Sequence, residues 1–239
     1  MIGIVYSQKT KNFLDRRFPT RDDKLWYQEG SEKALKEAGI PFASIYDTEW
    51  LKSGALDRCS ALFMENILCV DDEEIQLLKN YHAKGGGIVA MFGTSVRYGD
   101  GKIRPNYGLG EEFHLSCISD LRTDQWNEQP FGYIKVIKEH PVTQGIKIGK
   151  SLMYSKILQP IWAPRLTVNT GANVLANLCD FVNEELNLAA ITVTENNNNR
   201  IVYSGPSLSY RICQKQIPQD TDDLKKLIVN ACLWASKMI

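Results

Sequence analysis

The sequence has no excess of charge of either sign. Lys and Arg total 28, Asp and Glu also total 28, and the formal net charge of the 239 residues is zero. A neutral chain has no general electrostatic attraction to polyanions, so we expect neither nucleic acid nor an anionic membrane surface as a partner. No apolar run approaches the ~20 residues that a membrane-spanning helix needs. The N-terminus begins with a short strand-like run, Ile2–Tyr6, without the basic flank and long apolar stretch of a signal peptide.

Metal-ligating and redox-active patterns are also missing. The chain contains three His, and none of its cysteines forms a C-x-x-C pair. This composition indicates no ligand set for a metal, and we expect neither a metal nor another cofactor. Most of the cysteines lie among apolar neighbours, which is typical of buried reduced thiols in a cytoplasmic protein. The six cysteines of the chain are Cys59, Cys69, Cys117, Cys179, Cys213 and Cys232.

What is present is the composition of a globular protein, with 44% hydrophobic and 23% charged residues. There is no internal repeat and no linker long enough to separate domains, so we expect a single domain over residues 1–239. Compact apolar runs predict strands at 2–6, 42–46, 61–64 and 88–92. The polar, basic segment 7–21 reads as a loop. A helix is expected from Asp22, ended by Gly39 and Pro41.

The clearest unit lies between residues 61 and 92. Asp71 and Glu74 form a capping-box pattern that predicts the start of a helix. Gly85 to Gly87 would end that helix before the next apolar run. A strand, a helix and a strand within about 35 residues indicate a βαβ unit with parallel strands. The loop that follows, from Gly93 to Gly110, would then lie at the C-terminal end of a strand, where open α/β sheets bind ligands.

After residue 115 the pattern changes to short strand candidates separated by proline and glycine. We expect strands at 133–137, 174–178, 190–193 and 201–204, with a hairpin connection or a disordered tip at 196–199. A closing amphipathic helix is expected over 222–237. The predicted fold is α/β: a three-layer, flavodoxin-like sandwich with a mainly parallel sheet, helices on both faces and antiparallel edge strands.

One stretch resembles a known family. Residues 62–66, 71–74, 77–78 and 85–90, followed by Gly93-Thr-Ser95 and the segment 98–101, are similar to the trimerisation domain of β-galactosidases. That domain belongs to the class I glutamine amidotransferase-like superfamily, and similar segments occur in ThuA-like proteins. The resemblance is continuous over about residues 60–115 and patchy elsewhere. It implies the amidotransferase-like fold and, through the trimerisation domain, a role in subunit contact.

The chemistry of active amidotransferases is not supported by the residues. Those enzymes carry a Cys on a tight turn after a strand, together with a His-x-Glu pair. Here the equivalent turn reads Phe92-Gly-Thr-Ser95, and no His is followed by x-Glu. Ser95 is an alternative nucleophile, but Arg97 stands where a G-x-S-x-G elbow needs its last glycine. Thr94 and Ser95 could instead cap the turn or hydrogen-bond a ligand.

Candidate ligand-binding residues gather at the expected strand ends. Arg97 and Tyr98 could bind a sugar or a carboxylate, or could pack against a neighbouring subunit. Glu65 and Asn66 end the preceding strand; Glu65 could act as a general base or as a solvated or helix-capping group. The complete candidate set is Glu65, Asn66, Thr94, Ser95, Arg97 and Tyr98, and we assign no catalytic residue.

Two functions follow from these observations. The first is a non-catalytic amidotransferase-like domain that acts in oligomerisation or assembly, as a homo-oligomer or beside a carbohydrate-active partner. The alternative is a ThuA-like binding protein or hydrolase that takes a small molecule such as a sugar at the strand ends. A chain that starts at Met1 with a strand and ends on a helix suggests a free-standing protein.

Overall fold

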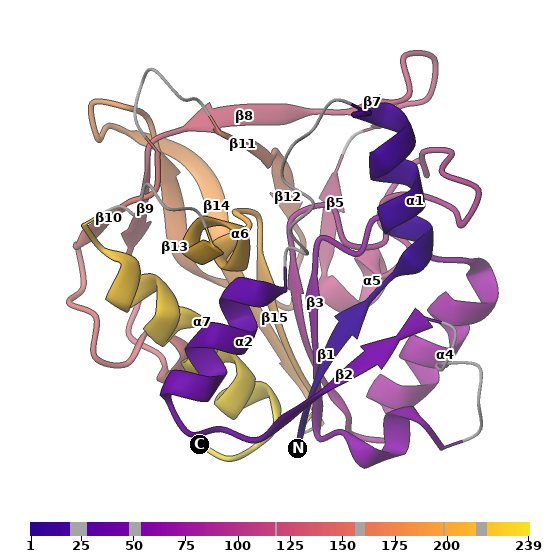
Figure 1. Cartoon of the computed structure of the whole chain (residues 1–239). Coiled ribbons are helices and arrows are strands. Elements are labelled where there is room, and N and C mark those ends of the chain that lie inside the picture. The colour runs from indigo at the N-terminus through magenta and orange to yellow at the C-terminus, as the bar shows by residue number, and fades with distance from the viewer. Residues whose placement is uncertain (20–27, 48–53, 118, 156–160, 198, 214–218) are drawn as a thin grey trace.

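A nine-stranded sheet runs through the centre of the molecule (Figure 1). The computed structural model describes residues 1–19, 28–47, 54–117, 119–155, 161–197, 199–213 and 219–239. From one edge of the sheet to the other, the strands are β10 (Ser151–Met153), β9 (Tyr133–Val136), β13 (Ala172–Cys179), β14 (Glu185–Asn196), β15 (Asn199–Ser204), β4 (Gly87–Met91), β3 (Ala61–Glu65), β1 (Ile2–Tyr6) and β2 (Phe42–Tyr46).

The sheet is mixed. Parallel pairing joins β15, β4, β3, β1 and β2, and antiparallel pairing joins β15, β14, β13, β9 and β10. This arrangement confirms the predicted α/β class, the βαβ unit of β3, α4 (Asp72–Ala83) and β4, and the antiparallel strands at one edge. The hairpin at 196–199 is also confirmed, because Asn196 of β14 pairs with Asn199 of β15.

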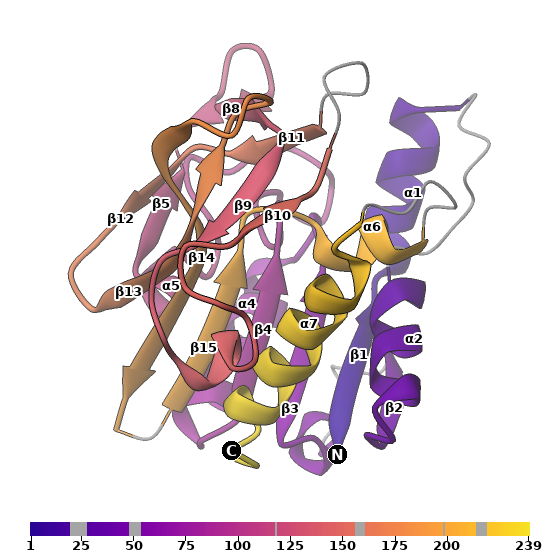
Figure 2. The same ribbon diagram turned by 90° about the vertical axis from the view of Figure 1, so that its left-hand side faces the viewer.

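Helices cover the sheet on both sides, and each set belongs to its own hydrophobic cluster. Ile2 and Ile4 of β1 belong to the cluster that contains α2 (Glu29–Glu37) and α7 (Thr221–Ala235), whereas Val5 belongs to the cluster of α4 and α5 (Gly110–Phe113). This alternation follows from the two-residue period of a strand. In Figure 2, α2, α7 and the short α6 (Leu208–Cys213) stand together on one face.

Local sequence signals account for the ends of these helices. The side chain of Glu74 accepts a hydrogen bond from the backbone N–H of Asp71 at 2.7 Å, which completes the predicted capping box. Gly39 ends α2 with φ +69°, as expected for a glycine after a helix. Gly87 brings β4 close to α7: a Cβ there would lie 2.1 Å from the carbonyl oxygen of Ala235.

The segment after β1 is where the sequence interpretation is wrong. Residues 8–17, predicted as part of a loop, form α1 (Gln8–Arg17). Ser7 caps this helix by accepting a hydrogen bond from the N–H of Thr10 at 3.1 Å. Phe13 and Leu14 pack on the core from an otherwise polar helix, which is why composition alone suggested a loop. The predicted helix start at Asp22 lies outside the described residues.

Short strands build the upper part of the molecule in Figure 1 and had no clear sequence signal. Ladders join β8 (Glu128–Phe131) to β11 (Ile161–Pro164), β5 (Leu115–Cys117) to β12 (Leu166–Val168), and β6 (Ser119–Asp120) to β7 (Gln125–Trp126). Two short 3₁₀ turns occur at Leu56–Arg58 and Pro141–Thr143. No helix in the described segments has the length and apolar character needed to span a bilayer.

Candidate functional site

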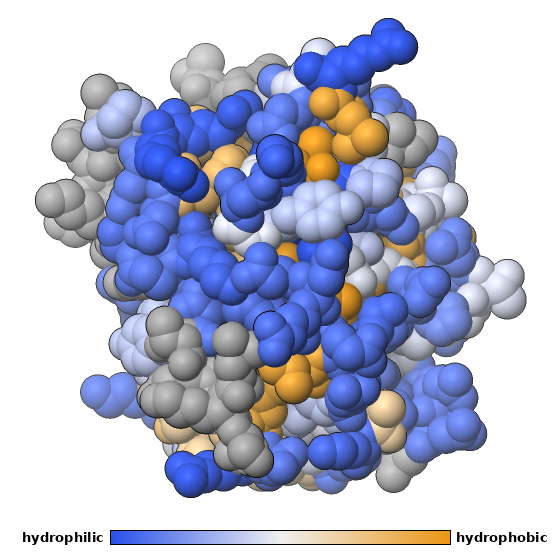
Figure 3. All heavy atoms as spheres, turned by 90° about the vertical axis from the view of Figure 1, so that its right-hand side faces the viewer, coloured by the Kyte–Doolittle hydropathy of each residue, from blue (hydrophilic) through white to orange (hydrophobic). Residues whose placement is uncertain are grey.

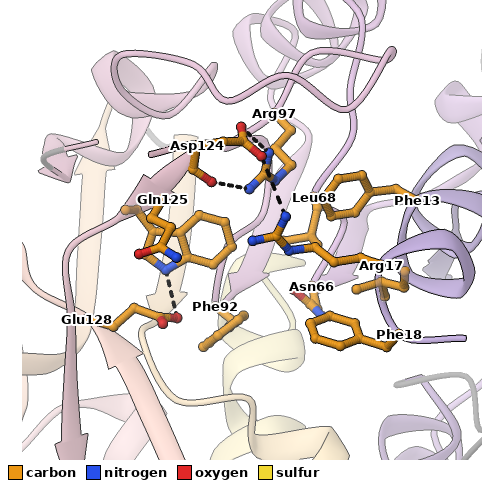
Figure 4. Close-up of a pocket in the computed structure, with 12 residues that line it drawn as sticks. Phe13, Arg17, Phe18, Asn66, Leu68, Phe92, Arg97, Asp124, Gln125 and Glu128 are labelled. Atoms are coloured by element: carbon orange, nitrogen blue, oxygen red, sulfur yellow. Dashed lines mark hydrogen bonds and ion pairs between the residues drawn. The ribbon is translucent and has the colours of Figure 1, made fainter. Parts of the chain in front are cut away.

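A pocket of about 360 Å³ opens at the C-terminal ends of β3 and β4 (Figure 4). This is the edge of a parallel sheet at which ligands bind in open α/β folds, and the volume is within the range of small-molecule sites. The walls come from α1, from the two strand ends, from the loop after β4 and from the segment 124–128. The lining residues are Phe13, Leu14, Arg17, Phe18, Asn66, Leu68, Phe92, Arg97, Asp124, Gln125, Trp126 and Glu128.

Two strand ends form the floor of the pocket through residues in the left-handed backbone region. Asn66 follows β3 with φ +52° and Phe92 follows β4 with φ +53°. Asn tolerates this conformation, whereas for Phe it costs on the order of 1 kcal/mol or more. The turn is held by the N–H of Phe92, which donates to the carbonyl of Ser204 at 2.7 Å, and by the Tyr203 hydroxyl, which donates to the carbonyl of Phe92.

Two residues of the strand-to-turn elbow adopt positive φ, Phe92 at +53° and Ser95 at +66°, and Phe92 is the first of them after β4. In enzymes built on such an elbow, the strained residue is the one that exposes the nucleophile. Here it carries a phenyl ring that lines the pocket and meets the ring of Trp126 edge-on, with centroids 6.0 Å apart. Ser95 lies three residues further on and is fully buried, and its Oγ accepts a hydrogen bond from the N–H of Leu109 at 3.2 Å.

Asn66 and Arg97 are the two predicted site residues that line the pocket. Arg97 is 2% exposed, and its guanidinium lies 4.5 Å from the ring centroid of Phe13 and 5.6 Å from that of Trp126. Its Nη1 donates to Asp124 Oδ1 at 2.7 Å, and its Nη2 donates to the carbonyl of Asp124 at 2.9 Å. Arg97 therefore links three walls of the pocket.

Thr94 and Tyr98 are placed elsewhere. The Thr94 hydroxyl is fully buried, lies 2.8 Å from the carbonyl of Met64, and accepts a hydrogen bond from the N–H of Ile67 at 3.3 Å. It therefore ties the ends of β3 and β4 together beneath the pocket. Tyr98 is 36% exposed and stacks on the guanidinium of Arg104 at 3.9 Å, outside the pocket.

Glu65 points away from the pocket, to the face that carries α6. It is fully buried, and its carboxyl group accepts hydrogen bonds from the Ser207 hydroxyl and, at 3.4 Å, from the N–H of Ser209. Burial raises the pKa of Glu65 to about 8 against these two bonds, which favour the charged form. Glu65 was predicted to be a general base, a solvated group or a helix-capping group; its burial does not fit a solvated group, and its contacts fit a helix-capping group, because they join the end of β3 to the start of α6.

Most of the pocket was not predicted from the sequence. Phe13 and Arg17 belong to the unexpected helix α1, and Asp124 and Trp126 to a hairpin of two-residue strands. The cue for α1 was present in the sequence, since Ser7 begins an N-cap pattern and Arg17 stands in the last turn, where a cation is favoured. No comparable pattern marks the hairpin.

The charges of the pocket balance: Arg17 and Arg97 against Asp124 and Glu128. Glu128 accepts a hydrogen bond from Trp126 Nε1 at 2.8 Å, and burial raises the pKa of Glu128 above its usual value. Within the described parts of the chain, no three His, Cys, Asp or Glu side chains gather closely enough to hold a metal ion.

Comparison with known proteins identifies solved structures that share the fold of this chain. No protein-family profile and no curated protein matches the sequence. Among solved structures, a β-galactosidase from Bacillus circulans superposes with a TM-score of 0.69 over 97% of this chain, at 16% identity. A putative ThuA-like protein from Bacteroides uniformis superposes with a TM-score of 0.58 over 98% of this chain and 91% of its own, at 15% identity. The fold is shared with both. The resemblance inferred from residues 60–115 is thereby confirmed at the level of the fold.

The extent of each match differs. This chain spans 30% of the B. circulans β-galactosidase chain, so the likeness concerns one part of that enzyme. The N-terminal domain of mmIFT52 is instead matched almost end to end, with a TM-score of 0.63 over 98% of this chain and 97% of that domain, at 13% identity. The same fold therefore occurs both within longer chains and as a domain close to this length.

Proposed function

We propose that this chain is a non-catalytic, amidotransferase-like domain that binds a small molecule in the pocket at the ends of β3 and β4. One observation carries the proposal: the elbow after β4 is retained in its strained form, with φ +53°, but presents the phenyl ring of Phe92 to the pocket. The turn has the backbone geometry that holds a nucleophile in amidotransferase-like enzymes, but here its first residue forms part of the pocket wall.

The composition of the pocket supports binding. Four aromatic rings line it, and two buried polar atoms, Asn66 Oδ1 and Arg97 Nε, have no hydrogen-bond partner within the protein. A buried polar atom without a partner costs about 1–3 kcal/mol, and a ligand that supplies the partner recovers that energy. The β-galactosidase and ThuA-like neighbours support a ligand from carbohydrate chemistry.

The test is a ligand screen with a matched pair of variants. Wild type is screened by thermal shift against neutral sugars, sugar acids and amino acids, and each stabilising compound is measured by titration calorimetry. Asn66→Gly removes the side chain at a backbone angle that glycine accepts, and we expect it to weaken binding about tenfold, as for the loss of one buried hydrogen bond.

Asn183→Gly is the control, because Asn183 has φ +68° at an exposed turn that is not part of the pocket. It should bind as wild type does. A screen without any stabilising compound, or an Asn66→Gly variant that binds like wild type, would count against the pocket. Release of ammonia from glutamine above the background rate would contradict the non-catalytic assignment.

Assembly is the second candidate, supported by the structural match to part of a longer β-galactosidase chain. The loop 93–110, considered above as an interface, is largely enclosed by its own chain: Ser95, Arg97, Ile103 and Tyr107 are all buried. Hydrophilic side chains cover most of the face that carries α1 and α4, with smaller hydrophobic areas between them (Figure 3). A homo-oligomer would therefore use another surface.

The free thiols support the proposed cytoplasmic setting.

A further inference from the structure

The pocket contains a partly exposed cation, Arg17, whose N–H groups can reach a ligand. Arg17 stands in the last turn of α1, and Figure 4 shows its side chain reaching across the pocket. Its Nη1 lies 3.8 Å from Asp124 Oδ2, which is longer than a hydrogen bond, and its side chain is 42% exposed. The buried Nε of Arg97 is a second donor without a partner.

Each acidic group of the pocket has one oxygen that accepts hydrogen bonds from the protein itself. Asp124 Oδ1 accepts hydrogen bonds from Arg97 Nη1 at 2.7 Å and from the N–H of Ile103 at 3.2 Å. Glu128 Oε1 accepts the indole N–H of Trp126. The acceptor that lacks a partner is Asn66 Oδ1, which belongs to a residue only 4% exposed. A ligand therefore meets the partly exposed guanidinium of Arg17 and the amide oxygen of Asn66, beside the second carboxylate oxygens of Asp124 and Glu128.

Each free group selects a chemical function. A guanidinium with its N–H groups unengaged binds a carboxylate in a bidentate manner. An amide oxygen requires a donor, which a hydroxyl group supplies. The rings of Phe92 and Trp126 also line the pocket and would cover a short carbon skeleton.

We infer that the pocket binds a small hydroxy-carboxylate, such as a sugar acid, with its carboxylate on Arg17 and a hydroxyl group donating to Asn66 Oδ1. This inference rests on the proposed function and specifies its ligand. A neutral sugar gives Arg17 no carboxylate closer than that of Asp124, and a cationic ligand is repelled by Arg17. Binding of the acid replaces the loose contact of Arg17 with Asp124 by a direct ion pair.

The experiment compares acids with a neutral sugar of similar size. D-glucuronate, D-gluconate, L-lactate and D-glucose are titrated by calorimetry into wild type, Arg17→Gln and Arg16→Gln. Arg16 is the matched control, because it is the adjacent helix residue, loses the same charge, and its Nε bonds the carbonyl of Asn12 outside this pocket.

We expect at least one acid to bind wild type and Arg16→Gln about tenfold or more tightly than D-glucose does. Arg17→Gln should remove that preference without lowering the melting temperature, since Arg17 is partly exposed. Its acid affinity should also become less sensitive to salt.

Three results would overturn the inference. The first is that D-glucose binds as tightly as the acids, and the second is that Arg17→Gln keeps the preference for acids. Either result rejects a carboxylate bound by Arg17 but leaves a pocket that binds small molecules. Absence of binding by all four compounds, together with a blank result in the wider screen, rejects the proposed function as well.

Discussion

Several non-glycine residues with positive φ lie away from the pocket, but three of them line it. Asn66, Phe92 and Asp124 all adopt positive φ, between +52° and +56°, and all three line it. Asn and Asp enter the left-handed region at modest cost because their short side chains hydrogen-bond locally, but Phe has no such compensation. Strain of this kind persists only where neighbouring contacts enforce it, and here the bonds of Phe92 to Tyr203 and Ser204 do so.

Glu65 is an ionisable group held out of water. Its pKa of about 8 in the folded protein exceeds the 4.5 of an exposed glutamate. Between these two pH values the folded state keeps a proton that the unfolded state has released. The free energy of unfolding therefore falls as pH rises from about 4.5 to about 8, by on the order of 1 kcal/mol per pH unit.

Glu65→Gln should remove this slope, because glutamine keeps an oxygen for Ser207 and does not ionise. Urea unfolding at pH 5 and pH 8 measures it: we expect the variant to gain stability relative to wild type at the higher pH. Glu184→Gln, at an exposed turn, is the control and should follow wild type at both. Parallel pH profiles for wild type and Glu65→Gln would show that Glu65 ionises normally.

At the scale of elements, Arg97 holds together parts of the chain that are far apart in sequence. Its guanidinium contacts Phe13 of α1 and Trp126 of β7, and it pairs with Asp124 in the turn between β6 and β7. Neither α1 nor the two-residue strands of that hairpin would be stable alone. The pocket walls thus depend on one buried cation.

Arg97→Met should lower the free energy of unfolding by about 2–4 kcal/mol, because it removes buried charge-assisted hydrogen bonds and keeps only the aliphatic stem. Lys102→Met in the same loop removes a cation from an exposed ion pair with Asp100, and should cost less than about 1 kcal/mol. Urea denaturation measures both. Equal costs would mean that the buried contacts of Arg97 contribute no more than a surface pair.

At the scale of the molecule, the parallel and antiparallel halves of the sheet have different roles. The parallel strands β3 and β4 bring Asn66 and Phe92 to one edge, and the antiparallel half extends the sheet on its far side. The pocket is finished by segments outside the nine strands, namely α1 and the β6–β7 hairpin. Proteins of this fold that bind different ligands would therefore differ mainly in the segments that correspond to α1 and the β6–β7 hairpin.

The assembly hypothesis also belongs to this scale. Light scattering at several protein concentrations gives the mass in solution, to be compared with 27.1 kDa for one chain. A mass of two or three chains that persists on dilution is the expected result for an assembly domain. A clean monomer that recovers no partner would reject this candidate and leave the binding role unaffected.

The sequence by itself determined the elements that local rules govern. The capping box at Asp71, the glycine stop at Gly39 and the apolar strands of the βαβ unit act within a few residues, so their position could be predicted without the fold. The same rules placed Glu65, Asn66 and the loop after β4 at the strand ends.

Only the tertiary structure decided which of those residues share a pocket. Glu65 and Asn66 are adjacent, yet Glu65 faces α6 and Asn66 faces α1, because successive side chains at a strand end point to opposite sides of the sheet. Arg17, Asp124 and Trp126 reach the same cavity from segments separated by more than 100 residues, through contacts that no local pattern records. Phe92 and Ser95 both adopt positive φ after β4, yet Phe92 lines the pocket and Ser95 is fully buried outside it, because the pairing of the strands as well as the local sequence sets where each side chain of the turn points.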